Sequence, residues 1–126
     1  MSFFLEKEKM GSTPYVLIDE DKKLMRIAGE SFHENIIEFF TDINEWLKKF
    51  LASNFDVFTF ECEMQYFNSS TAKLLLNMLL NMDDNAVDGK KITVNWMTTR
   101  DNDIIIECGE DFHEEMNNLE FNLIIK

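Results

Sequence analysis

Basic side chains are scarce in this sequence of 126 residues, which has 12 lysines and arginines against 24 aspartates and glutamates, a formal net charge of −12. Proteins that bind the nucleic-acid backbone do so through clusters of Lys and Arg, so this balance argues against a nucleic-acid partner. It leaves basic protein surfaces as better-matched partners, although much of the charge can serve solubility alone.

Cysteine and glycine are also few. Cys62 and Cys108 are far apart and form no CxxC pair, so the sequence predicts neither a zinc site nor a disulfide framework, and both are interpreted as small buried apolar residues. The four glycines are not clustered, which excludes a glycine-rich phosphate-binding loop. His33 and His113 stand in no metal-ligand spacing and are interpreted as surface or capping residues. We therefore expect no metal and no cofactor.

Long apolar runs are absent as well. None approaches the roughly 20 residues that a membrane-spanning helix needs, and the N-terminal segment lacks the basic start, apolar middle and cleavage site of a signal peptide. We expect no membrane association and a cytoplasmic location. A hydrophobic content of 45% is enough for a real core, and no repeat or linker divides the chain, so residues 1–126 are expected to form a single domain.

Hydrophobic periodicity predicts alternating strands and helices. From Phe58 to Met64 every second residue is apolar, while Glu61 and Glu63 lie on the opposite face, as in a half-buried strand. Because the strands keep polar residues on one side, we expect a mixed β-sheet with helices packed mainly on one face. The predicted strands are Pro14 to Ile18, Leu24 to Ala28, Phe55 to Met64, Lys91 to Trp96 and Phe121 to Ile125. The predicted helices run from a capping box at Ser31 and Glu34 to about Leu51, from about Ser70 to Met82, and over part of Asp101 to Met116.

Residues 66–73 are the most informative stretch, because three successive hydroxyls stand where a strand gives way to an apolar helix. A helix start offers unpaired backbone N–H groups and the positive end of the peptide dipoles, so an anion such as phosphate is stabilised there. Helix capping by a Ser, Thr or Asn explains part of the same pattern. Three hydroxyls are nevertheless more than one cap requires.

The helix that follows, from Thr71 to Met82, is apolar around nearly its whole circumference, whereas a helix that packs on one side needs a stripe of only about 100°. Two interpretations stay open. The helix is buried between the sheet and its neighbouring helices, or it presents a ridge that includes Leu76 and Leu80 to another protein.

Three blocks of sequence together resemble the SiaC-like family of bacterial regulatory phosphoproteins, whose fold is similar to STAS domains and anti-sigma-factor antagonists. The blocks are Ser12-Thr13-Pro14, the Gly29-Glu30-Ser31 segment with Glu34-Asn35, and Tyr66-Phe67-Asn68-Ser69-Ser70-Thr71-Ala72-Lys73, with Trp96 ending the next strand. The resemblance runs from about residue 12 to residue 100.

The resemblance implies a non-enzymatic switch with a STAS-like fold. In the family the residue directly after the Asn is the phospho-acceptor, which carries over to Ser69, and a Thr is familiar there. Ser70 and Thr71 are the alternative acceptors and are otherwise expected to be caps. A Ser/Thr protein kinase would add the phosphate, a PP2C-type phosphatase would remove it, and the unmodified form would dock on a diguanylate cyclase or an anti-sigma-like target. The expected switch surface consists of Asn68, Ser70, Thr71, Lys73, Leu76 and Leu80, with Lys73 one helical turn beyond Ser69.

Two other functions compete with this one. A small-molecule-binding STAS-like module would need a concave pocket with convergent polar groups, which the sequence does not locate. A small enzyme using Glu61, Glu63 or Asp111 would need an acid with a shifted pKa in a cleft, whereas the alternation around Glu61 and Glu63 is that of a solvent face. No catalytic residue is therefore predicted.

Overall fold

The computed structural model describes residues 2–126 as one six-stranded sheet with four helices. The strands are β1 (Phe4–Lys7), β2 (Tyr15–Asp19), β3 (Leu24–Ser31), β4 (Val57–Phe67), β5 (Lys91–Thr98) and β6 (Glu120–Ile125). The helices are α1 (Ile36–Phe39), α2 (Thr41–Ala52), α3 (Ser69–Asn85) and α4 (Asp103–Glu114). Within residues 2–126, none of these helices is both long and apolar enough to cross a bilayer.

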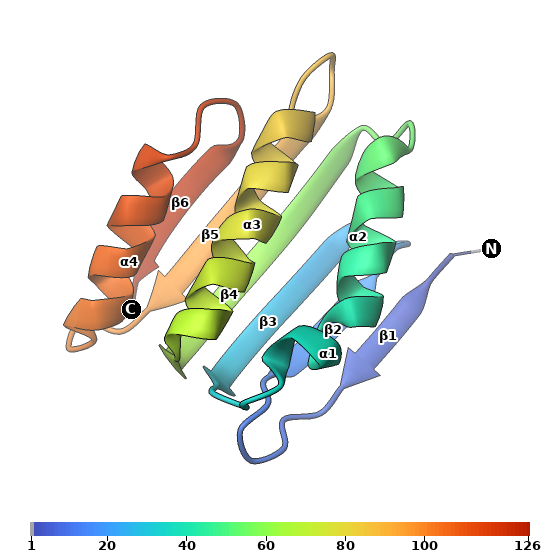
Figure 1. Ribbon diagram of the computed structural model, residues 1–126. Helices are drawn as coiled ribbons and strands as arrows, with labels where there is room; N and C mark the ends of the chain where they lie inside the picture. The colour runs from blue at the N-terminus through green and yellow to red at the C-terminus, as the bar shows by residue number, and fades with distance from the viewer. Residues whose placement is uncertain (1) are drawn as a thin grey trace.

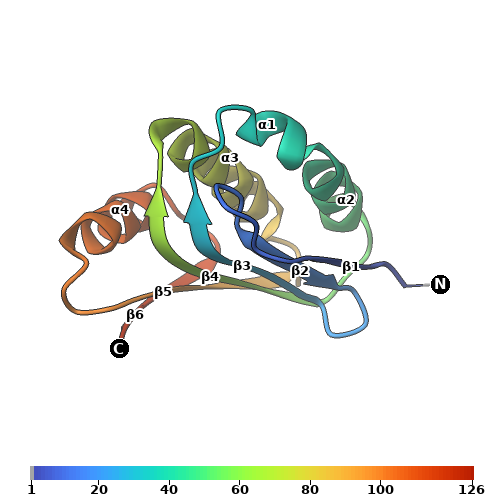
Figure 2. The ribbon, with the colours of Figure 1, turned by 90° about the horizontal axis from the view of Figure 1, so that it is seen from below.

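The strands lie in the sheet in their sequence order, from β1 at one edge to β6 at the other (Figure 1). The pairs β1–β2 and β2–β3 are antiparallel, and the pairs from β3 to β6 are parallel, so the predicted mixed sheet is confirmed. Figure 2 shows all four helices on the same face of the sheet. The expectation of helices on one face is therefore confirmed, and within residues 2–126 no helix covers the other, bare face.

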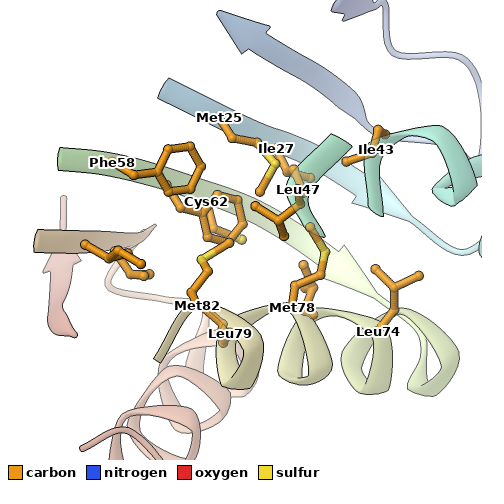
Figure 3. Packing of buried hydrophobic residues seen from close by; sticks show 14 of the residues in the cluster. Met25, Ile27, Ile43, Leu47, Phe58, Cys62, Leu74, Met78, Leu79 and Met82 are labelled. Carbon is orange, nitrogen blue, oxygen red and sulfur yellow. The ribbon is translucent and has the colours of Figure 1, made fainter. Parts of the chain in front are cut away.

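The core lies between this sheet and the helices and follows the predicted alternation. Phe58, Phe60, Cys62 and Met64 on β4 are buried, because they point toward the helices. Figure 3 shows residues of α2 and α3, such as Leu47, Met78 and Met82, packed against this face. Most of the apolar surface of α3 is thus covered by its own domain, as the first interpretation of that helix required.

Close packing between α4 and the sheet depends on Gly109. A Cβ atom there would lie 2.6 Å from the ring of Trp96, and Trp96 is held by a 3.0 Å hydrogen bond that its Nε1 donates to the carbonyl of Ile105. Glycine is therefore needed for space, because any side chain would overlap the indole.

The first helix differs from the prediction in two ways. The capping box is wrong, because Ser31 is the buried last residue of β3 and α1 begins only at Ile36, after Asn35. The predicted single helix is also split, since the buried Phe40 ends α1 and precedes α2. The strand predicted from Leu24 to Ala28 continues to Ser31 in β3, and its pairing with β4 shifts after Gly29, where the φ of +100° suits glycine.

Strand β1 was not predicted. Its residues alternate between exposed and half-buried, and the strand lies at the edge of the sheet, paired only with β2. A short edge strand of this kind has no apolar alternation for periodicity to detect.

Candidate functional site

The junction between β4 and α3 contains the residues that the sequence predicts to form a switch. Asn68 is the N-cap of α3, and its Oδ1 accepts a 3.0 Å hydrogen bond from the backbone N–H of Thr71. The expectation that Ser70 and Thr71 are caps is therefore wrong, because Asn68 alone fills that role. Ser69 and Ser70 are the first two residues of the helix, and both are exposed. Their hydroxyls are free of the capping role and accessible to another protein.

Thr71 is buried, at 1% exposure, and its hydroxyl lies 2.8 Å from that of Ser31. The Thr71 hydroxyl also donates to the backbone carbonyl of Ser31 at 3.2 Å, and the same carbonyl accepts a 3.1 Å bond from the N–H of Asn68. These bonds tie the end of β3 to the start of α3. A hydroxyl so enclosed is out of reach of a kinase, so the structure argues against Thr71 as an acceptor.

The four positions Ser69, Lys73, Leu76 and Leu80 follow one another at spacings of four, three and four residues, so they lie along one stripe of α3. Ser69 and Lys73 are exposed, whereas Leu76 and Leu80 are half-buried and Leu76 packs against the core. The stripe is therefore polar at the start of the helix and partly apolar beyond it. It turns away from the sheet, opposite the buried face of α3.

Large apolar side chains are exposed around the same end of the sheet. Phe32 directly follows β3, Tyr66 is near the end of β4, and the two rings meet edge to face with centroids 6.0 Å apart while remaining 44% and 49% exposed. Ile37 on α1 is 69% exposed and Ile104 at the start of α4 is 75% exposed. Because parallel strands end at a common edge, these side chains and Ser69 share that edge. Exposed apolar groups gathered in this way are typical of an interaction surface.

A groove of about 710 Å³, which Ser70 lines, opens between α3 and the α1–α2 segment. The residues that line it are Ile37, Asn44, Leu47, Lys48, Ser70, Lys73, Leu74, Asn77, Met78 and Asn81. Periodicity predicts each helix by itself, but it does not show which faces of two helices oppose one another, so sequence reasoning missed the groove.

The acidic candidates for catalysis have structural partners instead. Arg26 lies between Glu61 and Glu63 on the bare face of the sheet, and its Nη2 is 2.6 Å from Glu63. Hydrogen bonds from Lys126 and then from Arg26 lower the pKa of Glu63. A general acid at neutral pH needs the opposite shift. Asp111 is exposed on α4, so these acids form no cleft.

The histidines and cysteines also have structural environments. His33 Nδ1 accepts a 3.0 Å bond from the N–H of Asn35, and the ring of His113 stacks on Phe121. Burial raises the pKa of Cys62, and burial followed by the charge of Asp111 raises that of Cys108 to about 11, so neither thiol ionises readily at neutral pH. No group of His, Cys, Asp and Glu side chains within residues 2–126 has the arrangement of a metal site.

Comparison with known proteins places this geometry in context. The sequence model of the family described as "SiaC family regulatory phosphoprotein" matches residues 5–126, a longer span than the sequence blocks that suggested the resemblance. An uncharacterized protein of Pseudomonas aeruginosa (strain UCBPP-PA14) is 26% identical over 104 residues, which cover 82% of each chain.

Two solved structures have the same fold. The structure of SiaC of Pseudomonas aeruginosa has a TM-score of 0.89 at 22% identity, covering 98% of this chain and 99% of that one. A second structure, of the diguanylate cyclase SiaD in complex with its activator SiaC from the same organism, has a TM-score of 0.90 at 24% identity, covering 97% and 99%.

Proposed function

This chain belongs to the SiaC family of regulatory phosphoproteins, and we propose that it is a non-enzymatic signalling switch whose state is set by phosphorylation of Ser69. Without phosphate it docks on a diguanylate cyclase, and with phosphate it does not. A Ser/Thr kinase adds the phosphate, a PP2C-type phosphatase removes it, and the pathway operates in the cytoplasm.

The observation that carries this proposal is the exposure of Ser69 at the first position of α3, with Asn68 already serving as the cap. A hydroxyl that makes no capping bond is available for transfer of a phosphoryl group. The first turn of a helix also has backbone N–H groups without intrahelical partners, and these stabilise a phosphate once it is attached.

The effect of the phosphate depends on two free energies, its stabilisation of the helix start and the cost of burying its charge under a partner. It adds a charge of about −1.5 to −2, and at an exposed helix start the dipole contributes roughly 0.3 to 1 kcal/mol of stabilisation. A partner that covered Ser69 and the exposed rings of Phe32 and Tyr66 would have to bury this charge, which costs several kcal/mol if it is unpaired. The cost to docking exceeds the local gain, so the switch acts on the interface and leaves the fold intact.

A cyclase is the target favoured here because the solved complex of a relative contains the diguanylate cyclase SiaD with SiaC as its activator. An anti-sigma-like target is the less supported alternative, since it derives only from the wider resemblance to STAS domains. A small-molecule-binding module is a second candidate function, because the groove of about 710 Å³ falls within the size range of ligand pockets. Native mass spectrometry of the purified protein would reveal a bound ligand as added mass.

Kinase labelling of single variants tests the acceptor assignment. We expect wild type and Ser70→Ala to be phosphorylated by the cognate kinase, and Ser69→Ala to lose labelling. Ser70→Ala is a matched control because Ser70 is the neighbouring exposed hydroxyl on the same helical turn. Equal labelling of the Ser69→Ala variant would contradict the assignment.

A further inference from the structure

The two edges of the sheet differ in how well they are protected from pairing with another strand. Within residues 2–126 no strand pairs with the outer side of β1 or of β6, and the unpaired backbone groups of such an edge are a template for a further strand. Strand β1 is short and charged, with Glu6 and Lys7 among its four residues, and both features hinder such pairing. Strand β6 is longer, and Ile124 and Ile125 at its end are 38% and 44% exposed. The open edge of the sheet is therefore β6.

The backbone of β6 directs alternate residues to its two sides. The N–H of Lys126, directly after β6, donates a 2.9 Å hydrogen bond to the carbonyl of Thr98 at the end of β5. In a parallel pair, every second residue of a strand directs both of its backbone groups to the same neighbour. The even-numbered residues of β6 therefore bond to β5. Phe121, Leu123 and Ile125 direct their N–H and C=O groups to the open side, where an antiparallel strand could bond to all three.

The sequence of this edge complements itself when it is read in the opposite direction. It runs Glu-Phe-Asn-Leu-Ile-Ile-Lys, with an acid, Glu120, at one end and a base, Lys126, at the other. A second copy that runs antiparallel about Leu123 places Glu120 of each copy opposite Lys126 of the other. In the same register Phe121 lies opposite Ile125, and Leu123 lies opposite its own counterpart. Apolar residues thus meet apolar residues, and each charge meets its opposite.

The side chains that this register pairs are on matching faces of the sheet. Lys126 lies on the bare face, where its Nζ is 2.6 Å from Glu63, and Glu120 shares that face because side chains alternate along a strand. Their pair falls at a position without interstrand hydrogen bonds, where opposite Cα atoms are only about 4.5 Å apart and opposite charges stabilise the pairing. On the helix-covered face, Ile125 of one copy would lie beside Phe121 of the other. The pairing therefore covers an isoleucine that one copy leaves exposed.

Charge selects this register over its neighbours. A shift by two residues places Lys126 opposite Asn122 in one direction and Glu120 opposite Ile124 in the other, so each charge loses its partner. A shift by one residue places outward backbone groups opposite residues that already bond to β5, so the interstrand hydrogen bonds are lost.

We propose that β6 is a self-association site, through which two copies of this protein pair antiparallel about a two-fold axis and form one continuous sheet. About six backbone hydrogen bonds join the two strands. The contact is isologous and uses the open edge of each copy, so assembly stops at the dimer. The helices of both copies lie on the same face of the joined sheet, the face that they cover in Figure 2. The inference does not rest on the proposed function, because β6 is two strands away from β4, which leads to Ser69.

Sedimentation velocity of the wild-type protein measures the association. Each copy has a formal net charge of −12, and repulsion between like net charges opposes association. The experiment therefore uses about 0.3 M salt, which screens charges that are more than about 6 Å apart. We expect the protein to pass from monomer to dimer between about 10 μM and 1 mM. A wild-type protein that stays monomeric over this range would overturn the proposal.

A pair of complementary charge variants tests the register. Glu120→Lys and Lys126→Glu each place like charges opposite one another, so each variant alone should associate at least about tenfold more weakly than wild type. In an equimolar mixture, a copy with lysine at both positions meets a copy with glutamate at both. This restores both charge pairs, so the mixture should associate within about threefold of wild type. Lys126→Glu loses the bond to Glu63, but Arg26 still contacts that carboxylate at 2.6 Å.

Glu8→Lys is the matched control, because it makes the same change of charge at an exposed residue that follows β1, at the other edge of the sheet. It should stay within about twofold of wild type. An equal loss of association in Glu8→Lys and Glu120→Lys would show that only net charge matters and would overturn the proposal. A mixture that associates no better than the single variants would overturn it as well.

Amide hydrogen exchange followed by NMR tests the strand without any substitution. We expect the N–H groups of Phe121, Leu123 and Ile125 to exchange at least about fivefold more slowly at about 1 mM protein than at about 50 μM, because the second copy bonds to them. The N–H of Ile124 is the control, since it bonds to β5 and should exchange slowly at both concentrations. A dimer in which those three groups exchange at the same rate at both concentrations would use another surface and would overturn the proposal.

Discussion

Replacing Thr71 by Val should loosen the start of α3 without changing its shape. Valine has nearly the same volume, but it removes the hydroxyl that lies 2.8 Å from Ser31 Oγ and donates at 3.2 Å to the Ser31 carbonyl. The carbonyl keeps its bond from the N–H of Asn68, whereas the buried Ser31 hydroxyl loses its partner. A buried polar group left unpaired costs about 1–3 kcal/mol, so we expect the free energy of unfolding to fall by about 2 kcal/mol.

The double mutant Ser31→Ala/Thr71→Val gives the sharper result. Removing the Thr71 hydroxyl leaves that of Ser31 unpaired, whereas removing the Ser31 hydroxyl leaves Thr71 its bond to the Ser31 carbonyl. Once Ser31 is Ala, Thr71→Val no longer leaves a buried hydroxyl unpaired, so the double mutant should lose less stability than the two single mutants added together. The difference should be about 1 kcal/mol. At 126 residues, 1 kcal/mol corresponds to about 3 °C in Tm, so Thr71→Val should melt about 6 °C below wild type.

Urea unfolding followed by tryptophan fluorescence measures these changes, since Trp46 and Trp96 are both in the core. The midpoint should move while the slope of the free energy against urea stays constant, because the surface exposed on unfolding is unchanged. Strict additivity of the two single mutants, or an unchanged midpoint for Thr71→Val, would refute the assignment of the hydroxyl pair as the link between β3 and α3.

Three further predictions concern the support of the switch helix and the switch itself. Burial alone would raise the pKa of Asp83, but hydrogen bonds from the backbone N–H groups of residues 117–119 lower the pKa overall. The Asp83 carboxylate therefore stabilises the fold at pH values above the ordinary Asp pKa of about 4. This stabilisation is lost as the pH falls through the lowered pKa. Asp83→Asn should therefore lower Tm clearly at pH 7 and less at pH 3, and a constant difference in melting scans would contradict this. Gly109→Ala should lower the free energy of unfolding by about 1–3 kcal/mol, because its methyl group would overlap Trp96. An unchanged or higher midpoint in urea denaturation would contradict this and would show that the gain in helix propensity outweighs the overlap. Ser69→Asp supplies one charge and fewer acceptor oxygens than phosphate, so it should weaken target binding less than phosphorylation does, and an equal effect in a pull-down would count against the charge argument.

Periodicity predicted the parts of the fold that bury one face. The alternation along β4 and β5 and the apolar spacing of α2 and α3 specify which side of each element meets the core. Strands β4 and β5 and helix α3 appear close to their predicted limits, whereas α2 ends as predicted but begins only at Thr41. Strand β1 was not predicted because an edge strand pairs through its backbone and buries little apolar side-chain surface. The capping box at Ser31 failed because a Ser near a helix start is equally able to end a strand and bond to a distant hydroxyl.

The site was predicted only where it is local in sequence. The hydroxyl run next to Asn68 indicated a helix start with a surplus of hydroxyls, and Ser69 is exposed as expected for an acceptor. The burial of Thr71 depends on Ser31, 40 residues earlier, and the groove depends on two helices that face one another. Such long-range pairings are set by tertiary packing, which a single sequence does not display.

Binding of the cognate diguanylate cyclase by the same preparation before and after kinase treatment tests the central claim most directly, with a thermal melt of each form alongside. The account predicts that the unphosphorylated protein binds, that the protein phosphorylated at Ser69 binds at least about tenfold more weakly, and that its Tm is unchanged or slightly higher. Equal binding by both forms, or a phosphorylated protein that melts much earlier, would contradict it.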